Sequence, residues 1–176
     1  MKTQTVRATA DRAIRGVLQA AIVGAALVVM SATAHADLSK KVISTFRGQI
    51  LVSAEPLDSA GDDKATIAAF KKARLPAVTG EKNAEDVTVW SFYYTAFLKK
   101  TGATDLKFEF YTDDKDNRYA ADKRLAGVDP TTSVLTGSIE ISDDDGLAVG
   151  KAYKLRLTAT IKGKETVVAD TPIVMK

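Results

Sequence analysis

Residues 153–161 alternate strictly between apolar and polar side chains. The apolar members are Tyr153, Leu155, Leu157, Ala159 and Ile161, and Lys154, Arg156, Thr158 and Thr160 lie between them. Because successive side chains of a strand point to opposite faces of a sheet, this pattern predicts a β-strand with one face in a core and one in water. Such a strand is stable only against further strands and a second apolar layer, which the rest of the chain must supply.

Other segments have the period or composition of strands. The long ones are 42–54, 87–98, 106–112, 132–142 and 166–175, and a short one is expected at 75–79. Gly48 indicates a bulge or bend in the first. Asp170 and Pro172 interrupt the last, which indicates an edge position. The intervening residues 113–130 are predicted to form a long charged loop.

One segment predicts a helix. Residues 62–75 are rich in Ala and Lys, Asp62 or Asp63 is a suitable N-cap, and Ile67 and Phe70 lie on one face. A helix this short needs support from the sheet. We expect it to cover one face of strand 87–98, since both faces of that strand carry apolar side chains; the alternative is an exposed patch.

Tyr153 and the residues before it resemble a structural motif of known β-proteins. Leu147, Gly150 and Tyr153 are spaced by three, as in the tyrosine corner of Greek-key β-sandwiches, and Trp90 lies in an early central strand. The chain thereby resembles immunoglobulin-like and fibronectin-type-III-like domains, although the flanking cysteines of antibody domains are missing. The resemblance implies an all-β fold: a Greek-key β-sandwich of about seven strands with one short helical embellishment.

The first 36 residues read as a secretory signal peptide. Basic residues precede an apolar run at 17–30, and Ala34 and Ala36 form an A-x-A cleavage pattern. We expect cleavage after Ala36 and a single domain at 37–176. There is no Arg-Arg pair and no Cys, which favours general (Sec-type) secretion in a bacterium and excludes a lipid anchor. The expected location is the periplasm or the cell exterior, with no membrane anchor after cleavage.

Cleavage would leave few reactive groups. It removes four of the 25 basic and one of the 22 acidic residues, which leaves 21 of each and no net charge to attract nucleic acid. The only His, His35, leaves as well. A chain without His or Cys cannot hold a Ser-His-Asp triad, a Cys nucleophile or an ordinary zinc site, so an enzyme is not expected.

Two acidic turns are candidate calcium ligands. They contain Asp113, Asp114, Asp116 and Asn117 in one turn and Asp143, Asp144 and Asp145 in the other. Calcium takes six to eight oxygen ligands, which two loops at one end of a sandwich could supply together. The alternative is that both are solvated turns, because Asp and Asn are common turn residues.

Three aromatic residues are candidates for a ligand or partner surface: Tyr93, Phe97 and Tyr111. Exposed aromatic side chains stack on sugar rings, although those at strand spacing are more often part of a core. The leading prediction is a non-catalytic module that acts through contacts with a protein partner or with itself. The alternatives are a module that binds glycan or calcium, with no other cofactor, and a hydrolase that uses paired carboxylates.

Overall fold

The computed structural model describes residues 38–100, 102 and 105–176. The predicted signal peptide, residues 1–36, lies outside them. The described chain is mostly β, with nine strands in two sheets, two α-helices and one 3-10 helix. None of the helices in this part is long and apolar enough to cross a membrane.

Sheet A is built around β4 (Thr88–Phe97). Along one side β4 pairs with β7 (Val134–Ser142) through nine consecutive residue pairs, all antiparallel. Along its other side it pairs with β1 (Ile50–Ser53) and with the short β3 (Glu81–Lys82). β7 has β4 as its only strand partner among the described residues, so it is an edge of this sheet.

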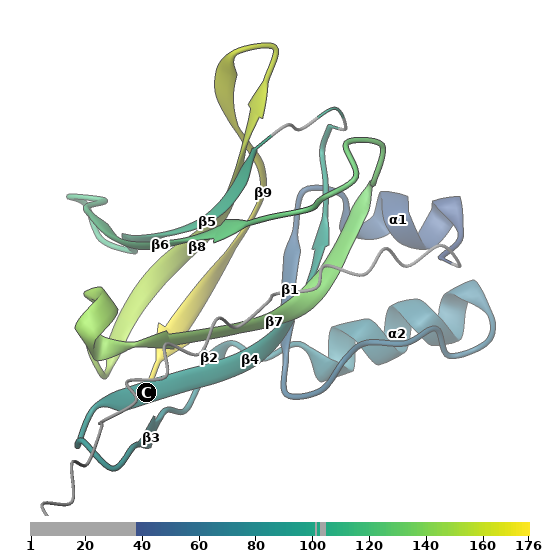
Figure 1. The fold of residues 1–176 in the computed structure, drawn as a ribbon. Coiled ribbons are helices and arrows are strands. Elements are labelled where there is room, and N and C mark those ends of the chain that lie inside the picture. Colours follow the sequence, from purple (N-terminus) through teal and green to yellow (C-terminus); the bar gives the residue numbers. More distant parts are fainter. Residues whose placement is uncertain (1–37, 101, 103–104) are drawn as a thin grey trace, which may run out of the picture.

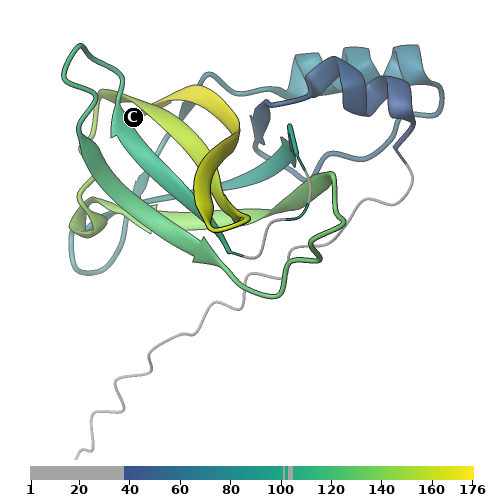
Figure 2. The same ribbon diagram turned by 90° about the horizontal axis from the view of Figure 1, so that it is seen from above.

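Sheet B has five strands in the order β2-β9-β8-β5-β6. Their bounds are Ala77–Val78, Lys164–Met175, Lys151–Ile161, Leu106–Thr112 and Tyr119–Leu125. A bridge between Gln49 and Asp170 joins the two sheets at one side. Figure 1 shows sheet B above sheet A, and Figure 2, seen from above, shows both helices at one end of the molecule.

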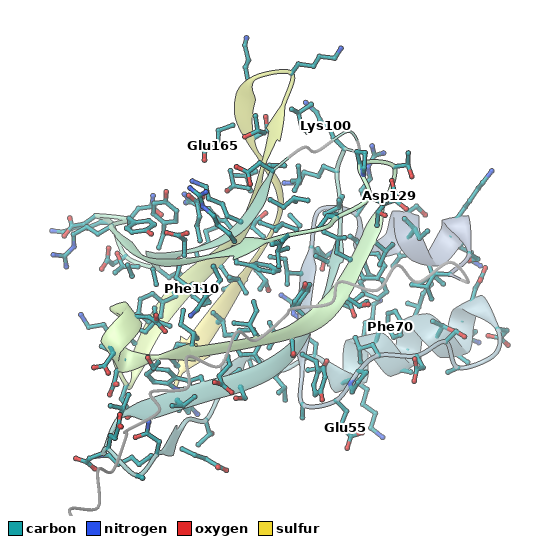
Figure 3. The ribbon with its side chains drawn as sticks, in the orientation of Figure 1. Glu55, Phe70, Lys100, Phe110, Asp129 and Glu165 are labelled. Atoms are coloured by element: carbon teal, nitrogen blue, oxygen red, sulfur yellow. The ribbon has the colours of Figure 1, made fainter. Side chains whose placement is uncertain are left out.

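The main core lies between the sheets. Trp90, Phe108 and Leu155 are fully buried there, and Figure 3 shows Phe110 in the same layer. Trp90 also donates a hydrogen bond from its Nε1 to the carbonyl of Lys176 (2.9 Å), which fixes the end of the chain to the core. The predicted central position of Trp90 is confirmed.

Two helices cover part of the outer face of sheet A. They are α1 (Lys40–Phe46) and α2 (Asp63–Ala73), with Ser39 and Asp62 as N-caps. Phe46, Phe70 and Phe97 meet beneath them, with ring centroids 5.2–6.3 Å apart. The predicted helix at 62–75 and its position over β4 are therefore confirmed, and of the two predicted caps Asp62 is the one used. Figure 3 labels Phe70 at this contact.

The predicted strand at 42–54 is wrong in its first half, where the chain forms α1. Val42 and Phe46 fit a period of two, but they are also four residues apart, and a helix places both on one buried face. Gly48 has a φ of 80°, a left-handed conformation that lets the chain turn from α1 into β1. The described residues thus form two α-helices, whereas the sequence predicted only the one at 62–75.

The loop predicted at 113–130 contains a strand, β6. Only Ala121 and Leu125 of β6 are buried, and its middle is charged, so the segment lacks a clear apolar alternation. The last strand is also longer than predicted, because β9 continues through Asp170 and Pro172. The amides of Asp170 and Val174 point away from β8, to Gly48 and Pro76, so proline between them removes no bond to β8.

The corner before β8 has the expected hydrogen bond. The Tyr153 hydroxyl accepts from the backbone N–H of Ala148 (2.8 Å), and both Tyr153 and Leu147 are buried. The contact closes the turn between β7 and β8 against the core.

Replacing Tyr153→Phe removes this hydrogen bond and keeps the ring. We expect the free energy of unfolding to fall by about 1–2 kcal/mol, because the Ala148 N–H loses its acceptor. Urea denaturation followed by circular dichroism measures the change. Tyr93→Phe, which removes a hydroxyl from a partly exposed side chain, is the control and should stay within about 0.5 kcal/mol of the wild type.

Phe70→Ala tests the attachment of the helices. Phe70 is 1% exposed and contacts two other rings, so its removal leaves a cavity and should lower stability by about 3–5 kcal/mol. The same denaturation assay measures it. Lys71→Ala, on an exposed neighbouring position of α2, should have little effect; equal losses for both variants would contradict the contact.

Candidate functional site

The first acidic turn, between β5 and β6, is held by its own hydrogen bonds. A carboxylate oxygen of Asp114 accepts from the Thr112 hydroxyl (2.9 Å) and from the backbone N–H groups of Asp116 and Asn117 (both 3.0 Å). The bond from Thr112 is the main cause that lowers the pKa of Asp114. Asn117 accepts from Arg156 instead (2.8 Å). The Asp114 oxygen therefore already accepts three hydrogen bonds within the turn, and the Asn117 oxygen accepts one from Arg156 of β8.

The second acidic turn is the 3-10 helix η1 (Asp143–Asp145), which follows β7. Asp143 accepts from the backbone N–H of Thr88 (3.2 Å), and Asp145 accepts from the N–H and hydroxyl of Ser142 (2.9 and 3.1 Å). Burial alone would raise the pKa of Asp145, but the bonds from Ser142 and the charge of Lys123 outweigh it and lower that pKa. Asp145 thus caps the end of β7.

The structure does not gather these acids into a metal centre. Within residues 38–100, 102 and 105–176, no group of three or more acidic side chains is placed to hold a metal ion. Asp144 is exposed on η1. The carboxylates of Asp114 and Asp145 accept hydrogen bonds within their own turns, and that of Asp143 accepts from Thr88 of β4.

The three predicted aromatic surface residues do not form one surface. Phe97 is fully buried beneath α1 and α2, so its assignment to a surface is wrong. Tyr93 is 38% exposed on the outer face of sheet A. Tyr111 lies on the outer face of sheet B, because it alternates with the buried Phe108 and Phe110. The two tyrosines therefore lie on the outer faces of different sheets.

Tyr111 is part of an aromatic cluster that we define by Tyr111, Tyr119, Arg156 and Asn117. The rings of Tyr111 and Tyr119 are edge to face (centroids 5.8 Å apart), and the Arg156 guanidinium lies 4.3 Å from the Tyr111 centroid. Tyr119 is 54% exposed and donates a hydrogen bond to Asp122. That bond is the main cause that raises the pKa of Tyr119 to about 12. Tyr119 was missed because its strand was predicted as a loop.

A buried carboxylate lies next to the cluster on β5. Glu109 is 6% exposed although it points to the outer face, because it accepts from the Thr158 hydroxyl (2.6 Å) and pairs with Lys107 (2.8 Å). Lys107 also pairs with Glu165 (2.6 Å), and these two partners raise the pKa of Lys107. These side-chain contacts link β5, β8 and β9. Glu109 accepts from Thr158, and both Glu109 and Glu165 pair with Lys107.

The second candidate is the side of β7 that faces away from β4, which we call the β7 edge. The N–H of Leu98 donates to the carbonyl of Ser133 (2.9 Å), in line with the β4–β7 register. Bonded pairs alternate in an antiparallel ladder, so the odd-numbered residues of β7 bond to β4. The even-numbered residues direct their backbone groups outward: Val134, Thr136, Ser138, Glu140 and Ser142.

At the end of β7, the backbone N–H of Ser142 does point away from β4, because it donates to Asp145. For Val134, Ser138 and Glu140, no backbone partner is present on this side among the described residues. The β7 edge is therefore open at these three residues among those described. Sequence reasoning predicted the strand but not its position in the sheet, which depends on distant pairing.

The edge strands β6 and β7 differ in their protection against pairing with another chain. β6 carries Asp122, Lys123 and Arg124 in a row and has a register shift against β5. Charges and bulges of this kind prevent an edge from pairing with another chain. β7 is nine residues long, has only Glu140 as a charged residue, contains no proline and pairs with β4 without a shift. It lacks these protections.

Both candidates present polar groups that act as hydrogen-bond donors and acceptors at the surface of the described chain. No protein-family model matches this chain, and a search of curated proteins finds no match. A functional assignment for this chain therefore rests on its own residues.

Replacing Asp122→Asn tests the cluster. Since a carboxylate acceptor disfavours the charged tyrosinate, its loss should lower the pKa of Tyr119 from about 12 toward the ordinary value of 10.0. Difference absorbance of tyrosinate during alkaline titration measures the shift. In a Tyr119→Phe background the same replacement should change nothing; a shift that persists there would contradict the assignment.

Proposed function

We propose that the protein is a non-catalytic binding module, exported to the periplasm or surface of a bacterium, that acts through protein contacts at the β7 edge. The observation that carries the proposal is that β7 is an edge strand with little charge, whose outward backbone groups at Val134, Ser138 and Glu140 have no partner among the described residues. An extended segment of a partner would add to sheet A there, with main-chain bonds for affinity and side chains for specificity.

The fold proposed for the module is a Greek-key sandwich of the immunoglobulin or fibronectin type III kind. Three observations support it: two sheets packed face to face, the hydroxyl of Tyr153 bonded to the corner before its strand, and Trp90 at the centre of the core. Because such folds serve many functions, the fold does not identify the partner.

The surroundings of the β7 edge suit an added strand. On the outer face, Tyr93 pairs with Ser138 and is one strand away from the edge, so its exposed ring can contact a segment laid along β7. On the inner face, Leu135, Ile139 and Ile141 form an apolar row that a partner strand can extend. The predicted partner-surface role of Tyr93 is kept in this form.

Glycan binding through the aromatic cluster is the second candidate. Tyr119 presents its half-exposed ring, and Arg156, Asn117 and Asp122 provide polar groups within the same cluster. Aromatic rings with nearby hydrogen-bonding groups are the usual elements of a sugar site. The face of Tyr111 that Arg156 covers is less suited to stacking, so Tyr119 would be the main contact.

In-cell photo-cross-linking tests the contact at β7. A benzoylphenylalanine at Ser138 should give a discrete covalent adduct, whereas the same group at Ser59, in an exposed loop, or at Asp122, in the cluster, should not. A second replacement, Glu140→Pro, removes an outward N–H and no bond to β4, and should abolish the adduct. Equal adducts from all three positions, or none from Ser138, would overturn the proposal.

A further inference from the structure

A groove at one end of sheet A is lined by charged residues of one sign only. It has a volume of about 590 Å³ and lies between α1, the residues that follow β4 and the residue that precedes β7. Figure 1 shows α1 beside this end of the sheet. We call it the basic groove. Its cations are Lys40, Arg47, Lys99 and Lys100. Three other grooves of the described chain are each lined by both acidic and basic residues, so the single sign distinguishes this one.

The packing of α1 directs two of these cations into the groove. Lys40, Ile43 and Arg47 are spaced by three and four residues, so they lie along one face of the helix and its C-cap. The neighbouring face carries Val42 and Phe46, which are buried in the apolar cluster beneath the helices. Because that contact fixes the helix, the face with Lys40 and Arg47 forms a wall of the groove.

Arg47 is held in place by the backbone. Its Nη2 donates a hydrogen bond to the carbonyl of Lys99 (2.8 Å), which fixes the plane of the guanidinium at the side of the groove. A guanidinium carries several N–H donors in a planar fork that matches the two oxygens of a carboxylate. One donor is used by the backbone, and the others remain for a ligand.

Three of the four cations have no carboxylate partner among the described residues: Lys40, Arg47 and Lys100. Lys99 differs, because its stem lies over Gly48 and its amine pairs with Asp170 (3.5 Å). Asp129, in the loop before β7, does not line the groove and accepts from Thr131. The groove therefore carries positive charge that the described chain does not compensate, and it attracts an anion.

The basic groove also has an apolar floor. Leu98 is 5% exposed and Ile43 is half-buried. The large apolar side chains that are exposed on the described chain lie elsewhere: Tyr93, Tyr119, Val149 and Val167. The described residues thus offer a lipid bilayer no apolar side chain to insert beside the cations, and a free phosphate would leave the floor uncovered. An extended peptide can place an aliphatic side chain on the floor and a carboxylate at the wall.

We propose that the basic groove binds an acidic segment of a protein partner. A carboxylate of the segment pairs with the Arg47 guanidinium, and a neighbouring aliphatic side chain packs on Ile43 and Leu98. Lys40 and Lys100 attract further acids of the same segment. This inference rests on the proposed function only in taking the partner to be a protein, since no residue of β7 lines the groove.

Peptide binding tests the proposal. The probe is the short peptide Gly-Ser-Glu-Leu-Glu-Ser-Gly with an uncharged dye, titrated with the purified protein at low salt and followed by fluorescence anisotropy. We expect a dissociation constant of about 0.1–1 mM, which rises with salt because the groove is exposed. Replacing both Glu by Gln in the peptide should weaken binding about tenfold, and replacing Leu by Gly about threefold. Equal binding of all three peptides would overturn the proposal.

Arg47→Gln should weaken the acidic peptide about three- to tenfold, and Arg47→Lys, which keeps the charge but not the fork, should weaken it less. Lys41→Gln is the matched control, because Lys41 is an exposed cation of the same helix that does not line the groove. Equal losses for Arg47→Gln and Lys41→Gln would indicate only diffuse charge. If Arg47→Gln lowers stability in urea but leaves peptide binding unchanged, Arg47 merely holds the Lys99 carbonyl, and the proposal fails.

Two further outcomes identify another occupant. Phosphatidylglycerol vesicles or inorganic phosphate that bind more tightly than the peptide, with the same dependence on Arg47, would overturn a protein segment as the ligand. The photo-cross-link at Ser138 separates this inference from the proposed function. Peptide binding without that adduct supports the basic groove and contradicts the β7 edge. The adduct without peptide binding supports the β7 edge and contradicts the basic groove.

Discussion

The structure depends on β4, a strand that is buried on both faces over its last four residues, 94–97. Its inner side chains, Trp90 and Tyr94, form the centre of the core between the sheets. On its outer face, Phe97 packs against Phe46 of α1 and Phe70 of α2. One strand thus contributes to both apolar clusters, the one between the two sheets and the one beneath the helices. The helices therefore protect a strand that would otherwise expose a second apolar face.

The position of β4 also explains why β7 is an edge strand among the described residues. β1 and β3 share its first side and are tied to sheet B through Gln49 and the C-terminal residues, so that side is closed. β7 occupies the whole second side, with nothing described beyond it. The helices are at the far end and cover a face, not an edge (Figure 1). β7 is thus a long edge strand with a single charged residue, and its outward backbone groups at Val134, Ser138 and Glu140 have no partner among the described residues.

Local patterns predicted most of the strands and the helix at 62–75, because alternation and capping depend on neighbours in the sequence. They failed at α1, where Val42 and Phe46 fit two periods, and at β6, where small and charged residues hide the alternation. For the candidate sites the sequence identified Tyr93, Tyr111 and Asn117 as exposed or polar. It placed Phe97 wrongly, since whether an outer-face side chain is covered depends on segments more than 20 residues away.

The sequence by itself determined the strand period of residues 153–161, the Tyr153 corner, the Asp62 cap and the absence of Cys from the whole chain. These are properties of residue type and short-range spacing. Only the tertiary structure decided that Tyr111 and Tyr119 share one cluster, that Asp145 caps β7 rather than joining a second acidic turn, and that β7 is an edge. Strand order and the direction of each backbone group follow from pairing between distant segments, and that pairing is selected by the packing of the whole core.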